Sequence, residues 1–298
     1  MKVENFKHTG TVAGFQVYNV TPVPGGDSYL FVDDSVTFVY DTGFCFSSEM
    51  LVENIKQVLG DRPLDYILVT HSHYDHAFGS AALSIHFPGS KVVASSYAAY
   101  VFTREGAKRT MVRLDDIEAK RQGYEPMTKY VNDLHVDIEV EDGSVLTLGK
   151  HEVEIMALPG HTNDCVGYWF KARGLFLSCE TLGLLASDDL VIPCALVGFQ
   201  KALDSIERVS KMDIKYYFIP HQGMVDDYKR FLKLSVEGHL LSRDMIIEGY
   251  KKGLSQEEMV QQYLDVFYLD KCKEVYPLAA AYENLNIMIP KILKEEGY

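Results

Sequence analysis

The sequence predicts a mixed α/β protein, of the α+β kind, in which two blocks of strands and helices precede a purely helical tail. Short runs of β-branched and aromatic residues alternate with runs of helical periodicity up to about residue 224. Each of the two blocks ends in a turn that carries histidine. From about residue 225 only helical periodicity remains. We therefore expect one large domain at 1–224 and a helical extension at 225–298.

The first block alternates strands and helices up to about residue 95. We expect strands at 17–23, 28–32, 36–40, 66–70 and 91–94, and helices at 47–59 and 77–87. Gly60 and the pair Pro88-Gly89 end these helices. Residues of about 97–135 then break the rhythm, because they are rich in charge and helical in spacing. We interpret them as a helical insert with helices at 96–108 and 114–123.

The second block returns to strand-like alternation and the tail to helical spacing. We expect strands at 136–141, 144–148, 152–158, 165–171, 175–178 and 216–219, a helix at 199–211, and tail helices at 225–252, 255–263 and 273–296. The tail cannot bury its apolar faces alone, so it should pack on the rest of the chain and cover the active site.

The segment from His71 to His76, with the sequence HSHYDH, follows the apolar run 66–70. Histidines at positions i and i+2 of an extended backbone point the same way, so His71 and His73 can bind one cation together. After the turn, Asp75 and His76 can face a second cation. Imidazole and carboxylate together suit Zn, Fe or Mn. The alternative is an ordinary polar turn after a strand.

Three further residues occupy similar positions at strand ends. His161 follows Pro159-Gly160, His221 follows Pro220, and Glu180 ends an apolar run that begins at 175. A single histidine after a strand is more often structural than a ligand. The recurrence of the same context at three places favours ligands here. The other histidines lack it and are not expected to bind metal, with the last three solvated: His8, His86, His135, His151 and His239.

Composition narrows the class of partner. The net charge of −13 argues against nucleic acid and anionic membrane surfaces as partners. The N-terminal residues form no apolar signal segment, and no run is long enough to span a bilayer. The five cysteines are odd in number and form no CxxC pair, so we expect buried, reduced thiols and a cytoplasmic protein.

These residues together resemble the metallo-β-lactamase superfamily. The HxHxDH motif at 71–76, PGHT at 159–162, an acid at 180, PHQG at 220–223 and the early turn Tyr40-Asp41-Thr42-Gly43 occur in the family's order. The resemblance covers about residues 15–225. It implies a four-layer αβ/βα sandwich, with metals at one edge between the two sheets.

The resemblance also implies a ligand set for two metal ions. His71, His73 and His161 would bind the first ion, and Asp75, His76 and His221 the second; Glu180 would bridge them. Asp41 would support a ligand histidine from behind. The chain departs from the family at Glu180, which is usually aspartate, so the acid could bridge both ions, bind one, or drop out. It departs again at Asn163-Asp164, where only a loop is expected to change.

The expected activity is that of a metal-dependent hydrolase. A metal-activated hydroxide would attack the carbonyl of an ester, thioester, lactone or amide in a small-molecule substrate, with Asp75 as ligand and proton acceptor. Two divalent metals are expected, zinc before iron or manganese. The helical tail is similar in outline to hydroxyacylglutathione hydrolases (glyoxalase II). Two alternatives stay open: a mononuclear iron persulfide dioxygenase, and a non-catalytic metabolite-binding protein with a degenerate site.

The aromatic residues of the insert and tail allow two interpretations. They either line the substrate pocket or pack the helices onto the core, and the second is the commoner role of any one ring. The residues concerned are Tyr97, Tyr100, Phe102, Tyr263, Phe267, Tyr268, Tyr276 and Tyr282. Apolar helical faces in the tail also make a homodimer plausible.

Overall fold

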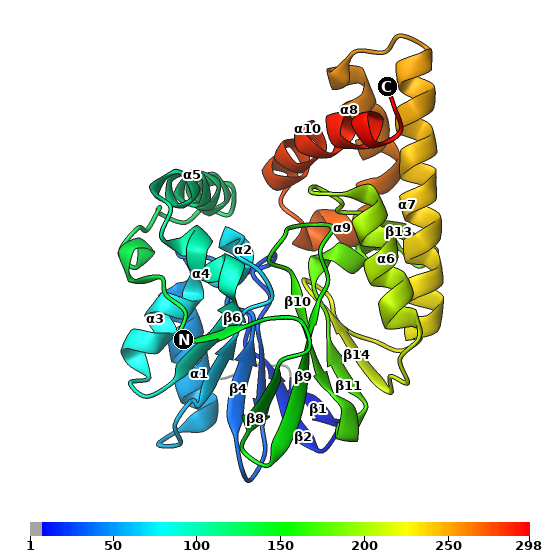
Figure 1. Ribbon diagram of the computed structural model, residues 1–298. Coiled ribbons are helices and arrows are strands. Elements are labelled where there is room, and N and C mark those ends of the chain that lie inside the picture. The colour runs from blue at the N-terminus through cyan, green and yellow to red at the C-terminus, as the bar shows by residue number, and fades with distance from the viewer. Residues whose placement is uncertain (1–7) are drawn as a thin grey trace.

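The computed structural model describes residues 8–298, so the expectations for the N-terminal segment and for the side chain of His8 lie outside it. Two β-sheets face each other and helices cover their outer faces, which makes four layers (Figure 1). The predicted αβ/βα sandwich is therefore confirmed.

The first sheet has seven strands in chain order. They are β1 (His8–Val12), β2 (Phe15–Asn19), β3 (Tyr29–Val32), β4 (Thr37–Tyr40), β5 (Tyr66–Leu68), β6 (Lys91–Ser95) and β7 (Ile138–Val140). Neighbours are antiparallel as far as β4 and parallel from β4 to β7. The carboxyl ends of β4, β5 and β6 therefore meet at one edge of the sheet.

The second sheet has six strands. Their order is β15 (Gly223–Val225), β14 (Tyr216–Ile219), β11 (Leu175–Leu177), β10 (Val166–Phe170), β9 (His151–Ala157) and β8 (Val145–Leu148). The backbone N–H of Val166 donates to the carbonyl of Thr70 at 2.9 Å and ties this sheet to the first. Aromatic rings fill the space between the sheets, and the rings of Phe31 and Phe38 stack with centroids 4.9 Å apart.

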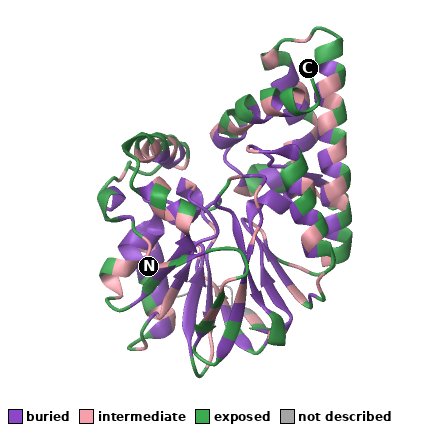
Figure 2. Ribbon diagram, in the orientation of Figure 1, coloured by how far each residue is buried: buried purple, intermediate pink, exposed green. Residues whose placement is uncertain are grey.

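Helices cover both outer faces. The first sheet carries α1 (Ser48–Leu59), the short α2 (Tyr74–Ala77) and α3 (Gly79–His86); the second carries α6 (Phe199–Ser210) and α7 (Tyr228–Lys251). Leu51 and Ile55 of α1 belong to the same hydrophobic core as Ile67 of β5, which explains the apolar stripe along that helix. Figure 2 shows buried residues along the strands and on the inner faces of the helices.

The insert differs from its prediction in one respect. It contains α4 (Ser96–Phe102), α5 (Glu105–Arg121) and the 3-10 turn Val131–Asp133, so one continuous helix replaces the expected break between 108 and 114. The break lies earlier, where Arg104 has extended backbone with φ −93° and ψ 111°. The charges at 108, 109 and 113 favour exposure of that face and do not end the helix.

The tail contains α7, α8 (Gln256–Phe267), α9 (Asp270–Val275) and α10 (Leu278–Glu295). Its apolar faces pack on a hairpin that sequence reasoning missed, β12 (Leu184–Ser187) with β13 (Leu190–Ile192). Gly238 of α7 lies against this hairpin so closely that a Cβ there would stand 2.2 Å from the carbonyl oxygen of Val191. The expectation of helix from residue 225 onward was wrong at its start, because β15 runs to Val225.

Two histidines expected in solvent are buried instead. His151 Nε2 lies 2.7 Å from Asp33 Oδ2, and the ring packs on Phe15. His239 is fully buried in α7, where its Nδ1–H donates to the carbonyl of Ser235 at 2.7 Å. Their charged neighbours misled the prediction, because those neighbours point outward from the same elements.

The cysteines agree with expectation, since all five are buried free thiols. Within residues 8–298, none of the helices combines the length and apolar character that crossing a membrane requires.

Candidate metal centre

The seven predicted ligand side chains meet at one edge of the sandwich, each placed by a strand end or a short helix. His71 and His73 follow β5, Asp75 and His76 lie in α2, His161 follows β9, Glu180 follows β11, and His221 lies between β14 and β15. They form two groups, and within each group the metal-ligating atoms lie within 4.8 Å of one another. The groups are His71, His73, His161 and Glu180, and Asp75, His76 and His221. Every predicted ligand belongs to one of the two groups.

Glu180 contacts both groups through one oxygen. Its Oε2 lies 3.1 Å from His161 Nε2 and 3.5 Å from His71 Nε2 in the first group. The same atom lies 3.4 Å from His76 Nε2 and 3.9 Å from His221 Nε2 in the second. Glu180 thus lies where an acid shared by two ions would lie.

The expectation that a strand ends on Glu180 was wrong. Strand β11 ends at Leu177, and Glu180 opens a 3-10 helix, η4 (Glu180–Leu182). The backbone has therefore left the sheet before the acid, which gives the longer glutamate side chain room to reach the centre. The first turn of η4 is fixed by Thr181, whose Oγ1 donates to the carbonyl of Leu158 at 2.6 Å.

The donor set fits divalent metal ions. Five buried donor atoms have no hydrogen-bond partner among the described residues, and they converge on the two groups: His71 Nε2, His76 Nε2, His221 Nε2, Asp75 Oδ1 and Glu180 Oε1. Buried polar atoms without partners are rare, because each costs free energy. Around a tetrahedral zinc with Zn–N of about 2.0–2.1 Å, neighbouring donors lie about 3.3–3.4 Å apart. The contacts of Glu180 Oε2 with the imidazoles bracket that spacing.

Two buried imidazoles each have their tautomer fixed by a hydrogen bond from the ring nitrogen that points away from the centre. The Nδ1 of His161 lies 2.9 Å from the carbonyl of Cys194, and the Nδ1 of His221 lies 3.1 Å from the carbonyl of Gly25. A carbonyl can only accept, so each Nδ1 carries the proton and each Nε2 presents a lone pair to the centre.

Asp41 organises the HxHxDH segment from behind. Its Oδ1 accepts from the backbone N–H of Thr70 at 2.8 Å, and its Oδ2 accepts from Thr70 Oγ1 at 2.9 Å. The same Oδ2 lies 2.9 Å from His76 Nδ1. Asp41 and His221 both have positive φ, 52° and 62°, which is uncommon for residues other than glycine and often marks functional sites.

For two of the ligands, His71 and Glu180, the pKa shifts favour the protonation state that binds metal. Burial lowers the pKa of the His71 imidazole well below its usual value, so the ring is neutral at pH 7. Burial alone would raise the pKa of Glu180, but the surrounding histidines, His161 first, hold it well below its usual value. Neutral imidazole and ionised carboxylate are the forms that bind metal.

Asp164 has a role that the sequence did not suggest. Its Oδ2 accepts from the backbone N–H of Ser72 at 2.6 Å, and the residue is buried beside the centre. The departure at Asn163-Asp164 therefore does more than alter a loop, since it fixes the backbone between His71 and His73. No motif at 164 marked this contact.

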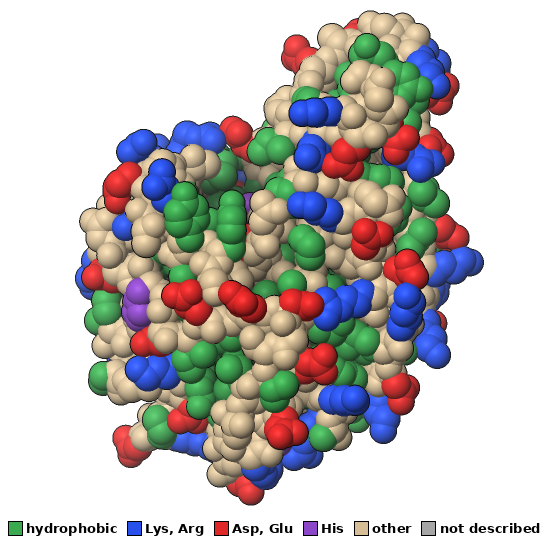
Figure 3. All heavy atoms as spheres, viewed as in Figure 1, with side chains coloured by type: hydrophobic (Ala, Val, Ile, Leu, Met, Phe, Trp, Pro, Cys, Tyr) green, Lys and Arg blue, Asp and Glu red, His purple; other side chains and the backbone are tan. Residues whose placement is uncertain are grey.

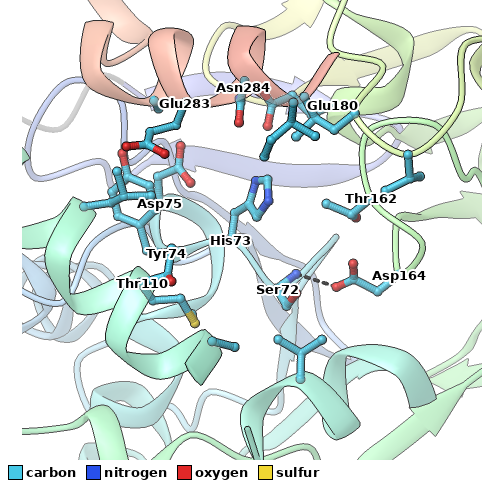
Figure 4. A pocket seen from close by; sticks show the side chains of 18 of the residues that line it. Ser72, His73, Tyr74, Asp75, Thr110, Thr162, Asp164, Glu180, Glu283 and Asn284 are labelled. Carbon is cyan, nitrogen blue, oxygen red and sulfur yellow. Dashed lines mark hydrogen bonds between the residues drawn. The ribbon is translucent and has the colours of Figure 1, made fainter. Parts of the chain in front are cut away.

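A cavity of about 370 Å³ opens onto the centre. His73, Asp75 and Glu180 form its floor, α4 and α5 one wall and α10 the other (Figures 3 and 4). Of the aromatic residues considered for the pocket, Tyr97 and Tyr276 line it. Phe102, Tyr263 and Phe267 are instead buried in the hydrophobic cores.

The fold and this centre define a metallo-β-lactamase-type protein, and comparison with known families agrees. The model of the metallo-beta-lactamase superfamily matches residues 21–221, so the chain belongs to that superfamily.

Two curated relatives are a hydrolase and a thioesterase by name. The chain is 26% identical over 186 residues to the hydroxyacylglutathione hydrolase of Francisella tularensis subsp. holarctica (strain FTNF002-00 / FTA), covering 62% of this chain and 58% of that protein. It is 24% identical over 183 residues to the human acyl-coenzyme A thioesterase MBLAC2, covering 60% and 61%. The chain thus spans less than two thirds of either relative.

Solved structures match over nearly the whole chain. A metallo-beta-lactamase family protein of Thermus thermophilus superposes with a TM-score of 0.66 at 16% identity, covering 94% of each chain. A superfamily protein of Sulfolobus tokodaii gives 0.57 at 19% identity, covering 93% and 96%. At these identities the likeness concerns the fold alone.

Proposed function

We propose that the chain is a dinuclear metal hydrolase that cleaves an ester, thioester, lactone or amide carbonyl. The family match, the named relatives and the donor cluster support a metal-binding hydrolase of its superfamily. The observation that carries the finer proposal is the contact of Glu180 Oε2 with imidazoles of both groups. His71, His73 and His161 would hold one ion, and Asp75, His76 and His221 the other.

The residues of the proposed site would have distinct roles in hydrolysis. Metals bound here would lower the pKa of a coordinated water from about 16 towards 7 and polarise a carbonyl oxygen. Asp75 Oδ2 lies 3.9 Å from both His76 Nε2 and His221 Nε2, while its Oδ1 has no partner among the described residues. The Asp75 oxygen that does not bind metal could accept the proton of the attacking water and return it to the leaving group. Asp41 keeps His76 in position throughout.

The test is the metal content of protein purified without chelator or added metal, followed by a panel of esters and thioesters. About two zinc or manganese ions per chain with carbonyl hydrolysis would support the proposal. One iron per chain, without hydrolysis, would overturn it and favour the persulfide dioxygenase. Protein that takes up no metal would also overturn the proposal and would favour a non-catalytic metabolite-binding protein with a degenerate site.

We also propose a reducing cytoplasmic compartment and a small-molecule substrate. The five buried free thiols support the first point, and the volume of the cavity, about 370 Å³, supports the second. A homodimer stays a prediction, which light scattering of the purified chain would test.

A further inference from the structure

We propose that the cavity takes an apolar acyl chain whose leaving group carries no negative charge. This inference rests on the proposed function, because it treats the cavity above the metal centre as the substrate site. It departs from what the named relatives suggest, since glutathione and coenzyme A are both anionic carriers.

Much of the cavity wall is aliphatic, beside polar residues such as Thr110, Asn163 and Asn284. Val101 of α4, Met111 and Leu114 of α5, Leu196 and Val197 of the loop before α6, and Ile287 of α10 line it. They share one cavity lining with the floor residues His73, Asp75 and Glu180. A chain whose carbonyl sits at the centre would extend along these walls, and each buried methylene would add to its affinity.

The charged side chains that line the cavity are all acidic. They are Asp75, Asp164, Glu180 and Glu283, and among the described lining residues none is lysine or arginine. Bound metals would offset the negative charges of Asp75 and Glu180 at the floor of the cavity. Glu283 remains on the wall, where Arg113 pairs with it at 3.1 Å. Arg113 is thus already engaged, and an anionic carrier would find no free cation on the described cavity wall.

Three cations of α5 lie on another face of that helix. Lys108, Arg109 and Lys120 line a separate surface groove together with Glu105 and Asp116. The residues of α5 that line the cavity are Ala107, Thr110, Met111 and Leu114, of which only Thr110 is polar. The groove therefore carries charges of both signs. Because residues on different faces of a helix point in different directions, the cations in the groove point away from the cavity.

The test compares three thioesters with the same octanoyl chain on metal-loaded protein. S-octanoyl-N-acetylcysteamine is neutral, whereas S-octanoylglutathione and octanoyl-CoA are anionic, and all three present the same bond. We expect kcat/KM to be about tenfold or more higher for the neutral substrate. Within the neutral series from acetyl to octanoyl, we expect a rise of about fourfold per methylene until the walls are filled.

A variant pair tests the wall directly. Ile287 is half exposed on α10, so Ile287→Lys should fold and place a cation at the cavity. We expect it to shift the ratio of glutathione to neutral thioester by about fivefold towards glutathione. Ile85→Lys is the matched control, because Ile85 is similarly exposed on α3 and does not line the cavity. It should leave the ratio unchanged.

Binding of methyl ketones of increasing length, which cannot be hydrolysed, separates the two proposals. Ketone affinity that rises with length supports the inference even if no thioester is cleaved, a result that would refute only the hydrolase proposal. Affinity and kcat/KM that do not change with chain length would overturn the inference. Faster cleavage of the glutathione or CoA thioester would also overturn it, and the CoA result would direct attention to the cations of the outer face of α5.

Discussion

Replacing Glu180 by aspartate should remove one metal ion from the centre. Glu180 Oε2 now lies 3.1–3.9 Å from imidazoles of both groups. Aspartate lacks one methylene, so its carboxylate would withdraw by about 1.5 Å along the side chain. A shared carboxylate must approach each ion to about 2.0–2.2 Å, and a retreat of this size exceeds what bond flexibility recovers.

The backbone cannot follow the shorter side chain easily. Thr181 holds the start of η4 through its bond to Leu158, and the backbone N–H of His161 donates to Thr181 Oγ1 at 3.1 Å. Moving residue 180 towards the centre would therefore break hydrogen bonds that also position His161. We expect Glu180→Asp to bind about one ion per chain and to weaken binding of the second by about 100-fold.

The assay is elemental analysis after desalting, combined with a zinc titration against a chromophoric chelator. Glu283→Asp is the matched control, because Glu283 lines the same cavity, is half exposed and pairs with Arg113 outside the donor groups. It should keep both ions. Glu180→Asp protein that retains two ions with unchanged affinity would refute the reasoning, and would mean that η4 is free to move towards the centre.

Three further predictions concern positioning, pH and packing. Asp41→Asn should weaken zinc binding by about 10–100-fold in the same titration, because His76 loses its charged partner. Burial lowers the pKa of His239 to about 4, from 6.5, so below pH 6.5 the unfolded chain binds a proton that the folded chain excludes. Stability should therefore fall as pH decreases from 6.5 to 4, by about 2 kcal/mol at pH 5, and His239→Gln should lack this part of the slope in urea unfolding. Gly238→Ala should destabilise the protein by about 3 kcal/mol through the clash with the hairpin. Gly106→Ala should change stability little, because the nearest atom to a Cβ there is the end of the Arg109 side chain at 3.9 Å.

Each of these predictions can fail in a distinct way. Zinc affinity of Asp41→Asn equal to that of the parent would show that His76 is held by other contacts. A pH slope of His239→Gln equal to that of the parent would mean that the ring is protonated in the folded state. Equal unfolding midpoints for the two glycine variants would mean that α7 can move away from the hairpin.

The strand ends and their histidines could be predicted from the sequence because their signals are local. An apolar run followed by HSHYDH predicts a buried strand with His71 and His73 just beyond its end, although the strand stops at Leu68, earlier than expected. The same holds for His161 and His221, each placed by proline or glycine after a strand. That these segments meet at one edge follows from the parallel pairing of β11 with β14 and of β4 with β5.

Other features depend on contacts between distant segments and have no local signal. The hairpin of β12 and β13 is stabilised by α7, which follows it much later in the chain. Asp164 matters because the backbone of Ser72 lies opposite it, and His239 is buried because of what α7 packs against. The sequence left open which aromatic rings line the cavity for the same reason, since packing of the tail decided which rings turned inward.

Each of the two donor groups draws on both halves of the chain. His71 and His73 meet His161 and Glu180, while Asp75 and His76 meet His221. During synthesis the first half would offer only a pair of ligands to each proposed ion, which makes a weak chelate. Loading of two ions would therefore require the emergence and docking of residue 221. A bound ion would then connect one sheet to the other, so its loss should loosen the sandwich along the seam between the two halves rather than at its outer helices.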